Sequence, residues 1–226
     1  MIIGISLVVT FSINHFHQKY VFKPLFENTI TFVSSYINQW QRTVKAFDTS
    51  YKPVVKDLLN VLASKLETSD ELSDEQITQL LTDKLETLSS EYIERANWYL
   101  INPNGVIERT NYATDLGLNL AKAVPRYWKA RFEPLKTGEL FIEGLSFEYR
   151  TNLPRIYGYR RLSNGWILEV GLALDPVIVN DLWQSVDELT QKGEYIERIS
   201  LYGASFAPFG QYPPVDDEEK QYFSMQ

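Results

Sequence analysis

Apolar residues recur every three or four positions along residues 22–66 of this chain. They are Phe22, Phe26, Ile30, Val33, Ile37, Trp40, Val44, Phe47, Tyr51, Val55, Leu58, Leu62 and Leu66. The mean spacing is close to 3.6, which is the period of one face of an α-helix. The pattern predicts a helix of about 45 residues, on the order of 65 Å long at 1.5 Å per residue. We interpret this helix as a stalk leading away from a membrane, because a compact cytosolic enzyme has little use for such length.

The segment before the long helix is apolar and short. Residues 1–13 (MIIGISLVVTFSI) contain no charged side chain. They fall short of the roughly 20 residues that cross a bilayer as a helix, and no small-x-small cleavage motif follows them directly. We interpret the segment as the truncated end of a transmembrane anchor. A secretory h-region and a buried core helix are the alternatives.

A second helix and a hairpin are predicted after the polar segment 67–72. Ser73 to Gln76 offers a capping box, in which Ser73 and Gln76 satisfy backbone groups at the start of a helix. Strands follow at 98–101 and 106–110, since Asn104-Gly105 between them supplies the positive φ that a hairpin turn requires.

Three further strands are predicted at 140–144, 155–162 and 166–174, with a second turn at Ser163-Asn164-Gly165. Asp175-Pro176 is typical of a helix start, so an exit helix is expected at 177–189. A last strand is expected at 196–202, as the beginning of another module.

These elements predict four regions in an α+β chain. An anchor (1–13) precedes the stalk helix (14–66), and a sensor module (67–190) follows. Residues 191–226 are interpreted as an incomplete second, membrane-proximal module or a tail.

The composition excludes several classes of function. The net charge is −7 and no basic block is present, which argues against nucleic-acid binding. The absence of cysteine removes disulfides, thiol nucleophiles and cysteine-ligated zinc. Both histidines, His15 and His17, lie near the N-terminus, too few for a zinc site and misplaced for a catalytic triad. We therefore expect no enzyme activity, no metal and no cofactor.

The order of elements resembles a PAS-like sensor, and the long helix before it resembles the Cache family of extracytoplasmic sensors. Residues 98–110 (WYLINPNGVIERT) and 155–175 (RIYGYRRLSNGWILEVGLALD) carry the resemblance, with the helix before each. It implies a long stalk helix packed on a five-stranded antiparallel sheet, as in the N-terminal part of a double-Cache receptor. It also implies a homodimer anchored in the bacterial inner membrane, with this region periplasmic or extracellular. The output would be a histidine kinase, a diguanylate cyclase or a chemoreceptor.

The same resemblance assigns candidate ligand-binding residues. In Cache sensors of amino acids, an arginine and aromatic residues hold the carboxylate, and an acid near the end of the last strand holds the ammonium group. Arg126 and Trp128 match the arginine and the aromatic, and Asp175 matches the acid. Ala121 and Lys129 stand where the family motif has aromatic residues, so the match is partial.

Tyr149, Tyr157 and Tyr159 complete the expected pocket. A guanidinium group forks onto a carboxylate, and aromatic rings exclude water around the pair. We therefore expect a small ligand, an amino acid or a carboxylate. The alternative is a ligand-free module for dimerisation or protein binding, in which Arg126 lies at the surface, Trp128 in the core and Asp175 at a helix cap.

Overall fold

Helix α1 (Phe22–Thr68) confirms the predicted long helix, and Pro53 lies inside it without ending it. The computed structural model describes residues 6–11, 22–68, 72–88, 92–148, 153–177 and 196–202, with the single positions 180, 184, 187, 188 and 191. Most of the predicted exit helix lies outside the described residues. The chain divides into two compact units, 1–45 with 147–152 and 176–226, and 46–146 with 153–175.

In the first unit, strand β1 (Ser6–Phe11) pairs antiparallel with strand β8 (Ile196–Tyr202). The strand predicted at 196–202 is thus confirmed. The prediction of a helix over residues 1–13 is wrong for residues 6–11, the part of this segment that the structure describes, because they form a strand. Val8, Val9 and Thr10 are β-branched and favour a strand once β8 supplies a partner. Within the described residues, no helix is both long and apolar enough to cross a membrane.

The second unit contains the predicted antiparallel sheet. Its strand order is β3 (Ile107–Thr110), β2 (Ile93–Ile101), β7 (Ile167–Leu174), β6 (Pro154–Arg161) and β4 (Leu140–Ile142). The short strand β5 (Ser146–Phe147) also pairs with β6. A long helix with a five-stranded antiparallel sheet confirms the predicted α+β, PAS-like fold.

Both predicted hairpin turns are present. Gly105 has φ +82° and joins β2 to β3, and Gly165 has φ +85° and joins β6 to β7. Their amide groups donate to the carbonyls of Asn102 and Leu162, at 2.9 and 3.0 Å. Glycine occupies both positions because side chains disfavour positive φ.

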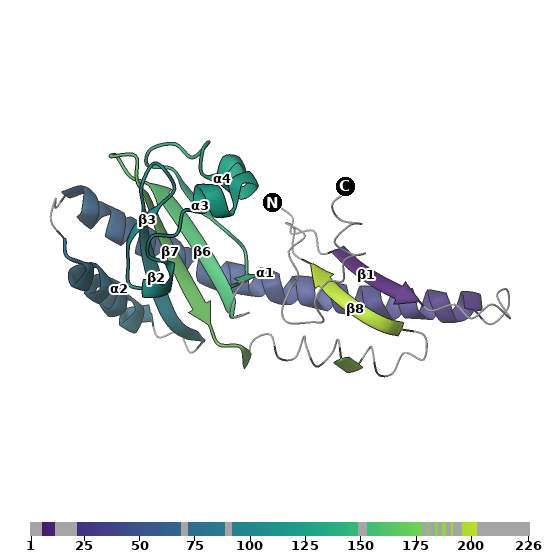
Figure 1. The fold of residues 1–226 in the computed structure, drawn as a ribbon. Helices are drawn as coiled ribbons and strands as arrows, with labels where there is room; N and C mark the ends of the chain where they lie inside the picture. The colour runs from purple at the N-terminus through teal and green to yellow at the C-terminus, as the bar shows by residue number, and fades with distance from the viewer. Residues whose placement is uncertain are drawn as a thin grey trace. The chain divides into compact units, whose positions relative to one another are not determined.

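The sheet is covered on both faces (Figure 1). The C-terminal part of α1 and helix α2 (Asp74–Leu88) lie on one face, and helices α3 (Leu120–Ala123) and α4 (Pro125–Arg131) lie on the other.

Strand β6 approaches α1 closely at Gly158. A Cβ atom at Gly158 would lie 2.4 Å from Val55 Cγ1 and 2.8 Å from Leu59 Cδ1. Two positions along the strand, Arg160 Nη1 donates to Asn60 Oδ1 at 2.6 Å. Even-numbered residues of β6 therefore face α1, and odd-numbered ones face α3 and α4.

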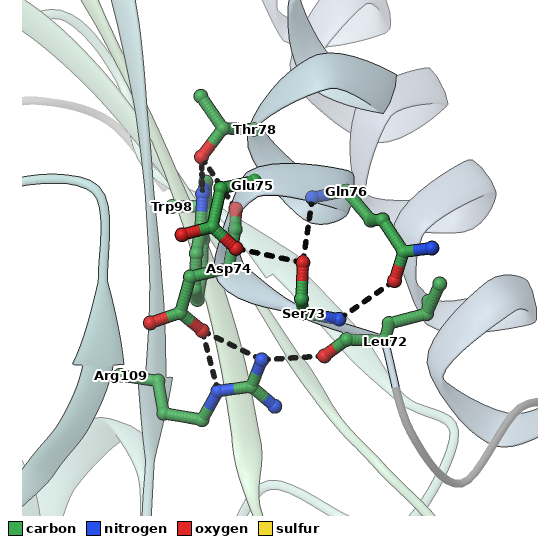
Figure 2. Close-up of polar contacts among 8 residues, drawn as sticks. All are labelled: Leu72, Ser73, Asp74, Glu75, Gln76, Thr78, Trp98 and Arg109. Atoms are coloured by element: carbon green, nitrogen blue, oxygen red, sulfur yellow. Dashed lines mark hydrogen bonds and ion pairs between the residues drawn. The ribbon is translucent and has the colours of Figure 1, made fainter.

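The predicted capping box starts α2 (Figure 2). The Ser73 amide donates to Gln76 Oε1 at 2.8 Å, and the Gln76 amide donates to Ser73 Oγ at 3.3 Å. This reciprocal pair satisfies two backbone donors that the helix leaves without partners.

Two side chains of the sheet hold α2 in place (Figure 2). Arg109 of β3 donates to Asp74 Oδ1 at 2.7 Å and to the Leu72 carbonyl at 2.6 Å. Trp98 of β2 donates its indole N–H to Thr78 Oγ1 at 2.9 Å. The start of α2 is thereby fixed to the β2–β3 hairpin.

The close approach at Gly158 gives a first prediction. Gly158→Ala should lower the free energy of unfolding by about 1–3 kcal/mol, because the added methyl group overpacks the stiff Val55 side chain. Urea denaturation monitored by circular dichroism measures the change. Gly158→Ala should cost less stability when it is introduced into the Val55→Ala variant than when it is introduced into the wild type, because the clash with Val55 is then removed. The same cost in both backgrounds would contradict the contact.

Candidate functional site

A row of polar and aromatic side chains crosses the sheet on the face opposite α1. Tyr99 of β2 lies opposite Glu169 of β7, and Glu169 lies opposite Tyr159 of β6. Residues directly opposite on neighbouring strands project on the same face. The Glu169 carboxyl group therefore lies between two tyrosines, with only 7% of the residue exposed.

The next row contains Asn97, Gly171 and Tyr157, again opposite one another. A Cβ atom at Gly171 would lie 2.9 Å from Tyr157 Cε1 and 3.8 Å from Arg155 Nη1. The missing side chain thus lets an aromatic ring and a guanidinium group lie over β7.

Arg155 is fully buried at the start of β6. Its Nη1 atom donates to Asn97 Oδ1 at 2.8 Å. Its Cζ atom lies 5.8 Å from the ring centre of Tyr112 and 6.0 Å from that of Tyr157. These contacts orient the guanidinium group on the same face as Glu169.

The two carboxyl groups on this face hold protons more tightly than usual. Burial, followed by the charges of Glu143 and Asp115, raises the pKa of Glu169 to about 8, against the opposing effect of Arg155. Burial raises the pKa of Glu143 to about 7, although the Tyr159 hydroxyl and Lys52 act to lower it. Both groups therefore titrate near neutral pH.

Tyrosine hydroxyls surround these acids. Tyr127 of α4 donates a hydrogen bond to Glu143 Oε1. Burial raises the pKa of both Tyr99 and Tyr159 well above the ordinary value, with a further contribution from Glu169. These phenols stay protonated and can donate hydrogen bonds.

Beside the polar rows, the space between α4 and the sheet is filled by aromatic rings. The Phe132 ring lies 4.8 Å from both the Trp128 and Tyr159 rings, centre to centre. Phe141 stacks on Tyr159 at 6.2 Å. This packed aromatic cluster bounds the polar rows on the α4 side.

The predicted site residues occupy different places. Tyr157 and Tyr159 lie on the polar face, and Trp128 lies in the adjoining aromatic cluster. Arg126 is exposed on α4, and among the described residues no hydrogen bond or ion pair ties it to this face. Asp175 is half-buried after β7, and its amide donates to the Tyr92 carbonyl at 2.9 Å. Tyr149 lies outside the described residues.

Arg155, Glu169, Asn97, Tyr99 and Glu143 were not predicted from the sequence. A signal was present for Glu169, which interrupts the otherwise apolar run ILEVGLAL of β7. A charged residue within a strand buried on both faces is unusual and indicates a special role. Among the described residues, no group of three or more His, Asp or Glu side chains has the arrangement of a metal site.

Comparison with known proteins finds no matching family model and no matching curated protein. The chain is similar to the ligand-binding domain of the Pseudomonas aeruginosa amino-acid chemoreceptor PctC, in complex with GABA (TM-score 0.39, 13% identity, 70% of this chain and 67% of that chain). It is also similar to the sensory domain of the Campylobacter jejuni chemoreceptor Tlp3 with isoleucine bound (TM-score 0.41, 13% identity, 90% and 81%). A third is the Bacillus subtilis YkuI protein, with an EAL domain, in complex with c-di-GMP and calcium (TM-score 0.40, 12% identity, 70% and 40%). Two of these three are sensory domains of chemoreceptors.

The raised pKa of Glu169 predicts how stability depends on pH. Between the ordinary value of 4.5 and about 8, the folded protein keeps a proton that the unfolded chain releases. Stability must then fall as the pH rises through this range. Glu169→Gln imitates the protonated acid, so the free energy of unfolding of this variant should fall less steeply with pH. Above pH 8 the variant should be more stable than the wild type by a few kcal/mol.

Denaturant unfolding at pH 5, 6.5 and 8.5 measures this difference. The control is Glu133→Gln, an exposed glutamate after α4, which should keep the wild-type slope. Parallel curves for Glu169→Gln and the wild type would contradict the assignment.

Proposed function

We propose that this chain is the small-ligand sensing domain of a transmembrane signalling receptor, located outside the cytoplasm. The observation that carries the proposal is the burial of Arg155 and Glu169 on the sheet face opposite α1. The receptor would act as a membrane-anchored homodimer. Its output would be a histidine kinase, a diguanylate cyclase or a chemotaxis signalling domain.

Buried ionisable groups support a binding site because they are costly in a core that serves only for stability. A hydrophobic residue at either position would avoid the cost of removing a charge from water. Instead, one sheet face holds a guanidinium group, two carboxyl groups with raised pKa values and several phenols. Such convergent polar groups with perturbed pKa values are typical of functional sites.

The site determines which ligand chemistry is expected. Arg155 takes the role that the sequence assigned to Arg126, because its guanidinium group lies among Asn97, Tyr112 and Tyr157. The guanidinium group would bind an anionic or polar group of the ligand. Trp128 would close the site from the α4 side. A small amino acid or carboxylate remains the expected ligand, and roles for Tyr149 and Asp175 remain predictions.

Strand β6 offers a route from the site to α1. Tyr157 and Tyr159 face the ligand side, and Gly158 between them contacts Val55 and Leu59 of α1 on the other side. If β6 and α1 pack in two alternative arrangements, a ligand that binds one arrangement more tightly shifts the equilibrium toward it. The size of the shift is set by the difference between the two affinities. Movement of α1 is the signal we expect to be transmitted toward the membrane.

A thermal-shift screen with amino acids, carboxylates and amines tests the proposal. At a concentration roughly a hundred times its Kd, a true ligand should raise the free energy of unfolding by about 2–3 kcal/mol. Arg155→Gln should weaken binding of that ligand by at least about tenfold, because it removes a charge-assisted contact. The matched control Arg126→Gln, at the exposed arginine, should bind like the wild type.

The reverse result, loss of binding in Arg126→Gln and not in Arg155→Gln, would move the site to α4. If Arg155→Gln fails to fold, Tyr157→Ala replaces it as the site variant. Stabilisation by none of the compounds, together with self-association that depends on concentration, would instead support the ligand-free dimerisation module.

A further inference from the structure

We propose that two copies of this chain bind each other through a knob and a groove. The knob is the exposed segment 116–124 of one copy, and the groove is the apolar hollow at Leu66, Leu72 and Trp166 of the other. Opposite charges around the two surfaces select the pairing. The contact does not involve the polar rows of the sheet, so it goes beyond the proposed ligand-sensing function.

The knob gathers apolar side chains that are exposed to solvent. Six large apolar residues are exposed in the described part of the chain, and three of them lie in this segment: Leu116 (58% exposed), Val124 (42%) and Leu118 (37%). Single exposed apolar residues are common, whereas a cluster of them marks a surface that contacts another molecule. The knob therefore has the composition of a contact surface.

Backbone contacts hold the knob in one conformation. The Gly117 amide donates to the Ile107 carbonyl at 2.8 Å. The Leu120 amide donates to the Gly105 carbonyl at 2.7 Å. A Cβ atom at Gly105 would lie 2.7 Å from Ala121 Cβ, so the segment packs directly against the turn between β2 and β3. A surface that is fixed in advance loses little conformational freedom when it binds.

The groove lies between the end of α1 and the start of α2. It encloses about 190 Å³, and its lining is mainly apolar: Leu66, Leu72, Leu100, Leu162 and Trp166. An apolar cavity of roughly 150 Å³ holds a molecule of the size of benzene, so the groove is large enough for one leucine or valine side chain of the knob. Leu66, Leu72 and Trp166 are only half-buried, which leaves the groove accessible from outside.

The sequence around each surface carries the opposite charge. Residues 116–131 (LGLNLAKAVPRYWKAR) contain four basic residues and no acid, although the chain has a net charge of −7. Residues 67–75 (ETSDELSDE), which include Leu72 of the groove, contain five acidic residues and no base. Lys122 and Lys129 are exposed, and among the described residues no ion pair or hydrogen bond engages either side chain. Charges of opposite sign steer two surfaces together and fix their register.

Carboxylates border the groove (Figure 2). Glu67 Oε1 accepts a hydrogen bond from the Ser163 amide at 3.1 Å, and Glu75 is exposed on the first turn of α2. Arg109 also lines the groove, but its guanidinium group is paired with Asp74 at 2.6 Å. The exposed carboxylates of one copy are thus placed to receive the lysines of the other.

A second copy of the chain complements both surfaces. Its knob supplies the apolar side chain and the lysines that the groove lacks, and its groove supplies the cover and the carboxylates that the knob lacks. A contact between two different surfaces leaves each copy with one of them free, unless the assembly closes. In the membrane-anchored receptor proposed above, anchoring raises the local concentration, so that even a weak contact links neighbouring receptors.

Sedimentation velocity of the full chain, over a range of protein and salt concentrations, measures the contact. The wild type should associate more as the protein concentration rises and less as the salt concentration rises. The knob variant (Leu116→Asp with Val124→Asp) and the groove variant (Glu67→Lys with Glu75→Lys) should each weaken association by at least about tenfold, because they remove apolar burial or reverse the charge. All four residues are exposed, so both variants should keep the circular dichroism spectrum of the wild type.

A mixture of the two variants identifies the pairing. The knob variant keeps an intact groove and the groove variant keeps an intact knob, so an equimolar mixture should associate under conditions in which neither variant does so alone. The matched control is Tyr92→Asp with Lys136→Glu, at two exposed residues outside the knob and the groove. This control should associate like the wild type.

Introduced cysteines give a second test, because the chain contains no cysteine of its own. Leu116→Cys in one copy and Leu72→Cys in a copy that carries a tag should form a mixed disulfide under mild oxidation. Two cysteines are joined only when their Cα atoms come within about 7 Å. Tyr92→Cys mixed with Leu72→Cys should give no such product.

Absence of self-association in the wild type, or self-association that the knob and groove variants leave unchanged, would overturn the proposal. In the second case the copies would meet elsewhere, for example through the stalk helix. A mixture that associates no more than its separate variants, or a mixed disulfide no more abundant than in the Tyr92 control, would also overturn the pairing of knob and groove. These outcomes are independent of the ligand screen, which tests the sheet face.

Discussion

The contact between α1 and strand β6 at Gly158 is the constraint on which the second unit depends. With no side chain at this position, Val55 and Leu59 approach the strand backbone closely enough to cover one face of the sheet. Because a helix occupies that face, Arg155, Tyr157 and Tyr159 project from β6 to the other face, and Arg160 on the α1 side is hydrogen-bonded to Asn60. The row of polar side chains and helix α1 therefore lie on opposite sides of the same strand.

Much of the fold was predictable because local rules govern it. The period of 3.6 over residues 22–66, the capping box at Ser73 and the glycines of two hairpin turns each depend on residues close together in sequence. The strand at residues 6–11 was not predicted, because β1 depends on pairing with β8, nearly two hundred residues away by the numbering of Ser6 and Tyr202. No local pattern reveals such a partner.

The site was less predictable for the same reason. A family pattern directed attention to Arg126 and Trp128, which lie close together on α4, but only Trp128 is buried. Arg155 and Asn97 meet through a hydrogen bond between residues 58 positions apart. That meeting follows from the sheet register, with β2 and β6 on either side of β7. Tyr157 and Tyr159 do share a face of the sheet, because they are two residues apart on one strand and alternation within a strand is a local property.

The register of β6 also limits how the chain can change over evolution. Side chains alternate strictly across a strand, so the insertion or deletion of a single residue within β6 would exchange its two faces. Arg155 and the tyrosines would then be driven into α1, and Gly158 would lose its position under Val55. Without a β-bulge, strand β6 keeps its two faces only when its length changes by two residues, whereas the loops at its ends are free of this restriction. Related chains are expected to vary in the loops and keep the spacing from Arg155 to Tyr159.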